Sequence, residues 1–143
     1  PAVQARGFHK PMDQFSHLMK ELPSIHAGFP SPANDYMGSV IDLNKELVRH
    51  PEATFFGRVV GDSMADADVH EGDVLVIDKS ITPSDGDMAV CYVDGEFCIK
   101  YISRRPDGIW LLPGNAKYKP IHLVEGNEFL VWGVVTYVIK KLR

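Results

Sequence analysis

The sequence predicts a mainly β fold: an antiparallel barrel or sandwich-like domain over residues 41–143, preceded by an extended, mobile arm over residues 1–40. Two observations support the domain. Short apolar or alternating runs are separated by turn signals such as Asp94-Gly95, and strands do not alternate with helices as they do around a parallel sheet. The arm is predicted because closely spaced prolines forbid a long helix and favour extended backbone. They are Pro11, Pro23, Pro30 and Pro32.

The expected elements are short. Within the arm, apolar residues recur at helical spacing over residues 12–21, which predicts one short helix. A second helix is expected over residues 43–49. The later apolar segments are bounded by turn residues, so strands are expected over residues 54–60, 73–78, 88–93, 96–102, 109–112 and 128–139.

One hairpin can be laid out residue by residue. Asp94-Gly95 is a strong type I′ turn signal, and a two-residue loop there pairs Val93 with Glu96, Tyr92 with Phe97, Cys91 with Cys98 and Ala89 with Lys100. One face of the hairpin is then apolar, with Met88, Val90, Tyr92, Phe97, Ile99 and Tyr101. On the other face, Lys100 lies among small or apolar neighbours, opposite an alanine that leaves room for its stem.

The last expected strand carries a prediction about assembly. Its segment 129–139 has almost no polar alternation, whereas a strand with one solvated face alternates. We therefore expect it to be buried on both sides, or to bury one side against another chain. Because an exposed apolar strand of this length would favour aggregation, a symmetric homodimer is expected.

Composition limits the possible functions. A chain of 143 residues with 45% hydrophobic and 24% charged residues is long enough for one globular domain. A formal net charge of −4 argues against a broad electrostatic grip on nucleic acid. The chain contains no run of 18 apolar residues and no secretory signal pattern, so we expect no membrane span and a cytoplasmic location.

Neither a metal nor a cofactor is expected. The six histidines never fall at i, i+4 on one helix, and two cysteines are too few for a four-thiolate zinc site. No phosphate-binding loop or dinucleotide-binding motif occurs. Cys91 and Cys98 face each other within reach of a disulfide, but a cytosolic compartment keeps thiols reduced, so both are expected to be free.

Ser63 and Lys100 are the candidate catalytic pair. Each has a plain structural explanation, because Ser63 with Asp66 three residues later resembles a helix start, and a strand lysine is usually solvated. Together they suggest chemistry: a serine nucleophile needs a base, and burial favours the neutral amine that can be one. The backbone N–H groups of Asp62 and Ser63 are candidate oxyanion donors. A Ser-His-Asp triad is not excluded by spacing.

Several motifs resemble the LexA/UmuD family of self-cleaving serine/lysine peptidases, and its UmuD branch in particular. They are Gly61-Asp62-Ser63-Met64 with Lys100 further along, Gly28-Phe29-Pro30-Ser31-Pro32-Ala33, His50-Pro51, Glu71-Gly72-Asp73, Val93-Asp94-Gly95-Glu96-Phe97 and Phe129-Leu130-Val131-Trp132-Gly133-Val134-Val135. The resemblance covers about residues 25–143. It implies a LexA/UmuD-like β barrel or clip-type catalytic domain, with Ser63 as nucleophile and Lys100 as base. The family cleaves itself before a glycine, which maps to Ala27-Gly28.

The resemblance also implies a role in the SOS response. It implies a homodimer that meets the RecA filament on single-stranded DNA, is cleaved there, and then serves a UmuC-type Y-family polymerase in error-prone translesion synthesis as residues 28–143. No direct sequence-specific DNA binding is implied. Two alternatives stay open. One is a non-catalytic β-barrel adaptor, in which Ser63 caps a helix and Lys100 is solvated. The other is a soluble protease resembling type I signal peptidase, which shares the Ser-Met motif and the lysine base.

Overall fold

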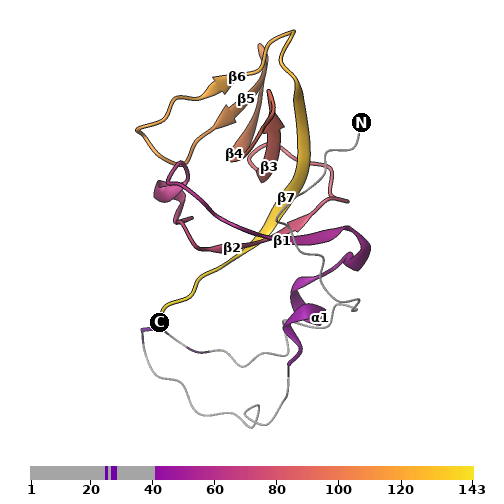
Figure 1. The fold of residues 1–143 in the computed structure, drawn as a ribbon, viewed down its shortest axis with the longest axis vertical. Helices are drawn as coiled ribbons and strands as arrows, with labels where there is room; N and C mark the ends of the chain where they lie inside the picture. Colours follow the sequence, from indigo (N-terminus) through magenta and orange to yellow (C-terminus); the bar gives the residue numbers. More distant parts are fainter. Residues whose placement is uncertain (1–24, 26, 29–40) are drawn as a thin grey trace.

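A computed structural model describes Ile25, Ala27, Gly28 and residues 41–143 of the chain (Figure 1). The expected mainly β, antiparallel class is confirmed, because strands dominate this part of the chain. In chain order its elements are α1 (Leu43–Leu47), η3 (Pro51–Ala53), β1 (Thr54–Arg58), η4 (Ala65–Ala67), β2 (Val74–Asp78), β3 (Met88–Val93), β4 (Glu96–Arg105), β5 (Gly108–Leu112), β6 (Ile121–His122) and β7 (Phe129–Ile139), where η marks a 3-10 helix.

The described strands form one seven-stranded sheet in the order β1-β2-β7-β3-β4-β5-β6. Every neighbouring pair is antiparallel. The long strand β7 joins the two halves of this sheet, because its first half pairs with β3 and its second half pairs with β2 (Figure 1). Register shifts at Val76/Ile77 and at Val90/Cys91 mark irregularities on either side of β7, and such bulges bend a sheet.

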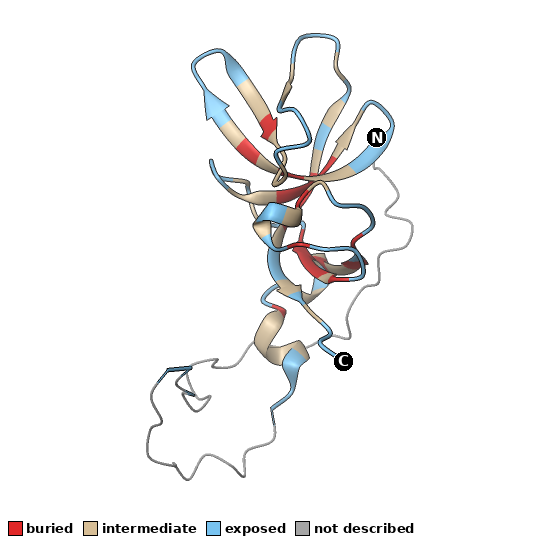
Figure 2. Cartoon of the chain, turned by 90° about the vertical axis from the view of Figure 1, so that its left-hand side faces the viewer, coloured by how far each residue is buried: buried red, intermediate tan, exposed pale blue. Residues whose placement is uncertain are grey.

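The core lies on both faces of β3. One cluster of buried side chains comprises Val59, Met64, Val69, Leu75, Ile77, Val90 and Trp132, and the other comprises Ala89, Cys91, Ile102 and Leu111. Successive residues of a strand point to opposite faces, so the apolar run of β3 supplies both clusters. Figure 2 shows the buried residues gathered where the strands cross, with exposed residues at the hairpin tips.

The predicted hairpin is confirmed residue by residue. Strands β3 and β4 pair in the expected register, from Val93 opposite Glu96 to Met88 opposite Tyr101. Both turn residues have positive φ, 45° at Asp94 and 93° at Gly95, as a type I′ turn requires. The register places Lys100 opposite Ala89.

Some element boundaries differ from those expected. The first described helix starts on the Asp42 cap, whose carboxylate accepts from Asn44 N–H, but it ends at Leu47 rather than at residue 49. Pro51 follows closely, and backbone before a proline is disfavoured in a helix. Strand β4 runs on to Arg105 because β5 pairs with its far end. The two-residue strand β6 was not predicted, since a segment this short carries no periodicity.

The expectation for the last strand is confirmed only at its centre. Trp132 and Val134 are buried, and a Cβ built on Gly133 would lie 2.5 Å from a methyl carbon of Ile77. Towards the two ends, Leu130 and Ile139 remain 41% and 42% exposed. Burial on both sides therefore holds where β7 crosses β2 and β3, and apolar surface remains near its ends.

Part of the prediction falls outside the described residues. This applies to the arm over residues 1–40, apart from Ile25, Ala27 and Gly28, and to its expected helix over residues 12–21.

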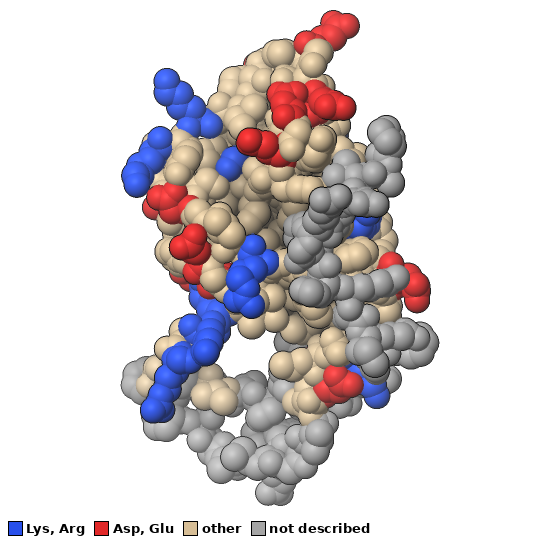
Figure 3. Space-filling model, in the orientation of Figure 1, with Lys and Arg blue, Asp and Glu red and all other residues tan. Residues whose placement is uncertain are grey.

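In the part of the chain that the structure does describe, no helix has the length and apolar character needed to cross a membrane. On the face shown in Figure 3, acidic side chains lie among the basic ones.

Candidate active site

Ser63 lies in the loop between β1 and η4. Gly61 turns the chain there with φ of 89°, a conformation that favours glycine, and its N–H donates to the Glu71 carboxylate. Met64, which directly follows Ser63, is 2% exposed and belongs to the core. Burying a methionine side chain contributes about 1.5–3 kcal/mol. The buried methionine therefore anchors the loop while Ser63 stays half-buried beside it.

Lys100 reaches Ser63 from strand β4. Its Nζ donates a hydrogen bond to Ser63 Oγ over 2.9 Å. The lysine is only 7% exposed, as the small and apolar neighbours in the hairpin predicted. The structure thus brings together the two residues that the sequence singled out, from positions far apart in the chain.

The plain structural explanations for the two residues are wrong. Helix η4 begins after Met64, which occupies the cap position, and no side chain caps it. Ser63 is therefore not a helix cap. Lys100 is buried rather than solvated. Both side chains are instead directed to each other.

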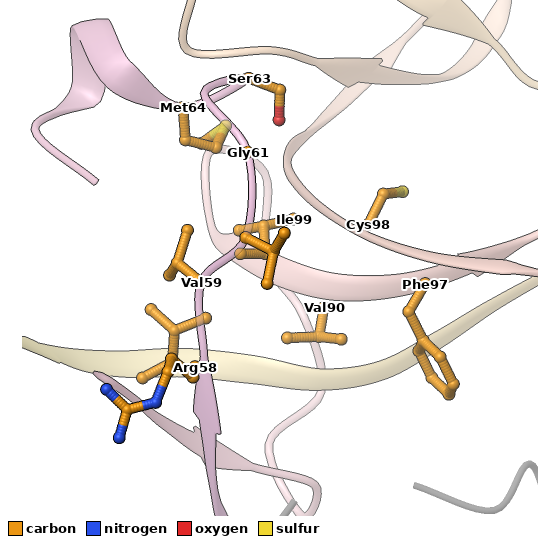
Figure 4. A pocket seen from close by; sticks show the side chains of 11 residues that line it. Arg58, Val59, Gly61, Ser63, Met64, Val90, Phe97, Cys98 and Ile99 are labelled. Carbon is orange, nitrogen blue, oxygen red and sulfur yellow. The ribbon is translucent and has the colours of Figure 1, made fainter. Parts of the chain in front are cut away.

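The Ser63 side chain borders a cavity of about 300 Å³ (Figure 4). Figure 4 shows Ser63 and Met64 at one end, with Arg58 and Phe97 at the other. The lining is mostly apolar and comprises Arg58, Val59, Val60, Gly61, Ser63, Met64, Leu75, Val90, Phe97, Cys98 and Ile99. Such a cavity suits the apolar side chains of an extended peptide next to the serine.

The predicted cleavage site does not lie in this cavity. Ala27 and Gly28 are both exposed, and neither lines the cavity beside Ser63. A Cβ built on Gly28 would have no neighbouring atom within 4 Å. The structure therefore shows an accessible Ala-Gly bond away from the candidate nucleophile.

The two cysteines are free, as predicted. Burial raises the pKa of the Cys91 thiol to about 12, and burial likewise raises the pKa of Cys98. Both sulfurs are therefore protonated thiols near neutral pH. Since the thiolate is the nucleophilic form of cysteine, neither sulfur competes with Ser63 as a nucleophile, although Cys98 lines the same cavity.

The candidate oxyanion donors lie in the same loop. Within the described part of the chain, the Ser63 backbone N–H donates no hydrogen bond. The Asp62 carbonyl accepts from Ala65 N–H at 3.1 Å. The bond from Ala65 N–H closes the turn in which Asp62 and Ser63 lie.

Sequence reasoning missed the groups that hold Asp62. The Tyr118 hydroxyl donates to the Asp62 carboxylate at 2.5 Å, and Asn115 Nδ2 donates to its backbone carbonyl at 2.8 Å. The hydrogen bond from Tyr118 lowers the pKa of Asp62, and Asp62 in turn raises the pKa of Tyr118. The only sequence signal here was the turn Pro113-Gly114-Asn115, because these contacts span more than fifty positions.

A second polar cluster also contains serine, histidine and aspartate. His50 Nδ1 contacts the buried Asp78 carboxylate at 2.6 Å. The Ser80 hydroxyl donates to Asp78 rather than to His50, so the serine lacks a base and the cluster is not a catalytic triad. Burial opposes ionisation of Asp78, but hydrogen bonds from His50 and Ser80 outweigh it and lower the pKa of this carboxyl. Among the described residues, no group of three acidic, histidine or cysteine side chains is placed to bind a metal.

Comparisons with known proteins agree with these motifs. The model of the family described as Peptidase S24-like matches residues 18–136. SamA of Salmonella typhimurium is 44% identical over 117 residues, which are 82% of this chain and 81% of SamA. ImpA of Escherichia coli is 38% identical over 141 residues, 95% of each chain. The LexA repressor of Mycolicibacterium smegmatis is 38% identical over 85% of this chain and 48% of the repressor.

Proposed function

The chain belongs to the Peptidase S24-like family, and from this premise we propose that it is a serine endopeptidase that cleaves its own backbone between Ala27 and Gly28. The observation that carries the proposal is the 2.9 Å contact between Lys100 Nζ and Ser63 Oγ. A nucleophile in hydrogen-bond contact with its base is the arrangement that serine catalysis needs.

In the proposed acylation step, the neutral Lys100 amine takes the proton of the Ser63 hydroxyl. Ser63 Oγ attacks the carbonyl carbon of Ala27, and backbone N–H groups of Asp62 and Ser63 stabilise the resulting oxyanion. The carbon–nitrogen bond to Gly28 then breaks, and Lys100 returns the proton to the departing amine. The product is an ester between Ser63 and Ala27.

Hydrolysis of this ester completes the reaction. Lys100 takes a proton from a water molecule, whose oxygen attacks the ester carbonyl. The proton passes back to Ser63 Oγ as it leaves, so the pair returns to its starting state. The released products are residues 1–27, with a new carboxylate at Ala27, and residues 28–143, with a new amine at Gly28.

The accessible Ala27-Gly28 bond supports its assignment as the substrate. Small side chains at both positions let an attacking oxygen approach the carbonyl without a clash. The bond has to move to Ser63, either in the same chain or from a second copy, and a tethered substrate has a high local concentration. The cleavage rate is then set by how often the arm occupies the cavity, and a partner that favours this state raises the rate.

The UmuD resemblance supports a cytoplasmic role in SOS mutagenesis. We propose that a homodimer of this chain docks on a RecA filament bound to single-stranded DNA, which raises the occupancy of the cavity by the arm. The 28–143 product then acts with a UmuC-type Y-family polymerase in translesion synthesis. The filament acts here on a conformational equilibrium and contributes no catalytic group.

Incubation of the purified chain with and without an activated RecA filament tests this proposal. Mass spectrometry of the whole mixture should find the two fragments 1–27 and 28–143. Both should form faster with the filament. A Gly28→Glu variant, which crowds the scissile bond, should stay intact. A wild-type chain that stays whole in both conditions would favour the non-catalytic adaptor instead.

A further inference from the structure

The loop of residues 113–118, between β5 and β6, lies against the loop that carries Ser63. Three side chains of this 113–118 loop contact Asp62, the residue before the candidate nucleophile. Tyr118 and Lys117 donate to its carboxylate at 2.5 and 3.4 Å, and Asn115 donates to its carbonyl at 2.8 Å. The backbone on one side of Ser63 is therefore held by hydrogen bonds from a distant segment.

The other side of Ser63 is held by close packing against the same loop. The backbone N–H of Gly114 lies 3.1 Å from the Met64 sulfur, and its carbonyl accepts from Asp66 N–H. A Cβ built on Gly114 would lie 2.9 Å from Cβ of Ala67 and 3.2 Å from Cα of Met64. Glycine at position 114 thus lets the 113–118 loop pack directly against Met64 and Ala67, which a side chain would prevent.

The hydrogen bonds to Asp62 are exposed, which separates their local effect from global stability. The Asp62 side chain is 50% exposed, and Tyr118 is 45% exposed. Exposed polar contacts contribute little to the free energy of unfolding, so their loss leaves the fold intact. The 2.9 Å contact between Ser63 and Lys100, however, depends on where the loop places Ser63. Misplacing a catalytic group by about 1 Å can cost on the order of 100-fold in rate.

We propose that Tyr118 and Asp62 are positioning residues for the nucleophile, joined by a hydrogen bond that fixes Ser63 within reach of Lys100. Neither side chain touches the reacting atoms. The inference rests on the proposed function, because it assumes that Ser63 is the nucleophile.

A fluorophosphonate probe tests the proposal, because it reports on Ser63 without requiring the arm to dock. Ser63 Oγ attacks phosphorus, fluoride leaves, and the hydroxyl proton passes to Lys100. Tyr118→Phe and Asp62→Ala should each slow labelling of Ser63 about tenfold. Asp62→Asn keeps an oxygen that accepts from the Tyr118 hydroxyl, and it should label within about twofold of the wild type. The matched control is Tyr137→Phe, which removes the same atom from β7 and should change nothing.

The design distinguishes positioning from loss of the fold. Each variant should melt within about 2 °C of the wild type, because the lost bond is exposed. The double variant Tyr118→Phe/Asp62→Ala should label no more slowly than the slower single variant, since both changes remove the same bond. Asn115→Ala, which removes the bond from the Asn115 amide to the Asp62 carbonyl and leaves the one from Ala65 N–H, is a second test of how the 113–118 loop positions Ser63.

Two results would overturn the proposal while leaving the proposed function standing: wild-type labelling rates in Tyr118→Phe and Asp62→Ala, or effects that multiply in the double variant. If the probe fails to label Ser63 in the wild-type chain, the assignment of the nucleophile is wrong, and the positioning role falls with it.

Discussion

At the scale of single residues, one short contact and the burial of one lysine define the candidate site. Lys100 is 7% exposed. Within the described part of the chain, its amine forms one hydrogen bond, to Ser63 Oγ. A buried lysine whose amine meets a serine hydroxyl differs from the solvated strand lysines of most proteins. The neighbouring thiols are held protonated by burial, which leaves the Ser63 hydroxyl as the candidate nucleophile.

The proposed role of Lys100 as base predicts the pH dependence of the proposed cleavage. Unassisted cleavage should rise from neutral to alkaline pH, because the amine accepts the serine proton only in its neutral form. Lys100→Arg keeps a positive charge and a hydrogen-bond donor, but a guanidinium is not deprotonated in proteins. This variant should lose at least about 100-fold in rate at every pH.

The measurement is the rate of fragment formation across a pH series, followed by mass. A wild-type rate that falls towards alkaline pH would show that the active lysine is protonated, or that another group is the base.

At the scale of elements, polar contacts join the start of β2 to the end of its neighbour β7. Asp73 precedes β2, and its carboxylate accepts from His70 N–H at 2.9 Å and from Lys140, which follows β7. The bond from His70, together with that from Lys140, holds the pKa of Asp73 below its usual value. The ionised carboxylate therefore stabilises the fold above the ordinary carboxyl pKa of about 3.9, and this stability is lost as pH falls through the lowered value.

Asp73→Asn should consequently lower the Tm at pH 7 by roughly 3–8 °C, since it weakens bonds to an ionised group. The difference from the wild type should shrink as pH falls from 7 towards 3, below the ordinary carboxyl pKa of about 3.9, because the wild type then loses part of the stability that its ionised carboxylate supplies. Thermal melts by circular dichroism at both pH values measure this. The exposed Glu125→Gln variant is the control for loss of one negative charge. A Tm difference that is equally large at both pH values would contradict the role of the ionised carboxylate.

Elements with local signals were predictable from the sequence. The hairpin of β3 and β4 was predicted in full, because its turn residues and its alternation lie within one short segment. That register also predicted the burial of Lys100. The far end of β4 and the strand β6 were not predictable, since they depend on pairing with β5. The contacts of Tyr118 and Asn115 with Asp62 likewise arise only when distant loops meet.

At the scale of the whole molecule, the apolar residues near the ends of β7 bear on assembly. Leu130 and Ile139 remain exposed, and Phe97 on the neighbouring hairpin is 38% exposed. A second copy of the chain packed on this strand would cover these side chains. We therefore expect a homodimer, as the proposed function requires.

Sedimentation equilibrium at micromolar concentration should give the mass of a dimer for both the intact chain and the 28–143 product. Loss of residues 1–27 changes the formal charge by one unit only, so electrostatic repulsion does not split the dimer after cleavage. A monomer in both forms would contradict the expected assembly.

Ser63 is proposed to cut the Ala27-Gly28 bond, either in its own chain or in a second copy. The most direct test of this cleavage is the intact mass of the purified protein during incubation at alkaline pH, for the wild type and for Ser63→Ala. The control is Ser80→Ala, because the wild-type Ser80 hydroxyl donates to Asp78 and not to Lys100. The wild type and the control should yield fragments 1–27 and 28–143, and Ser63→Ala should stay whole with or without a RecA filament. Cleavage of Ser63→Ala at the same bond would contradict the account.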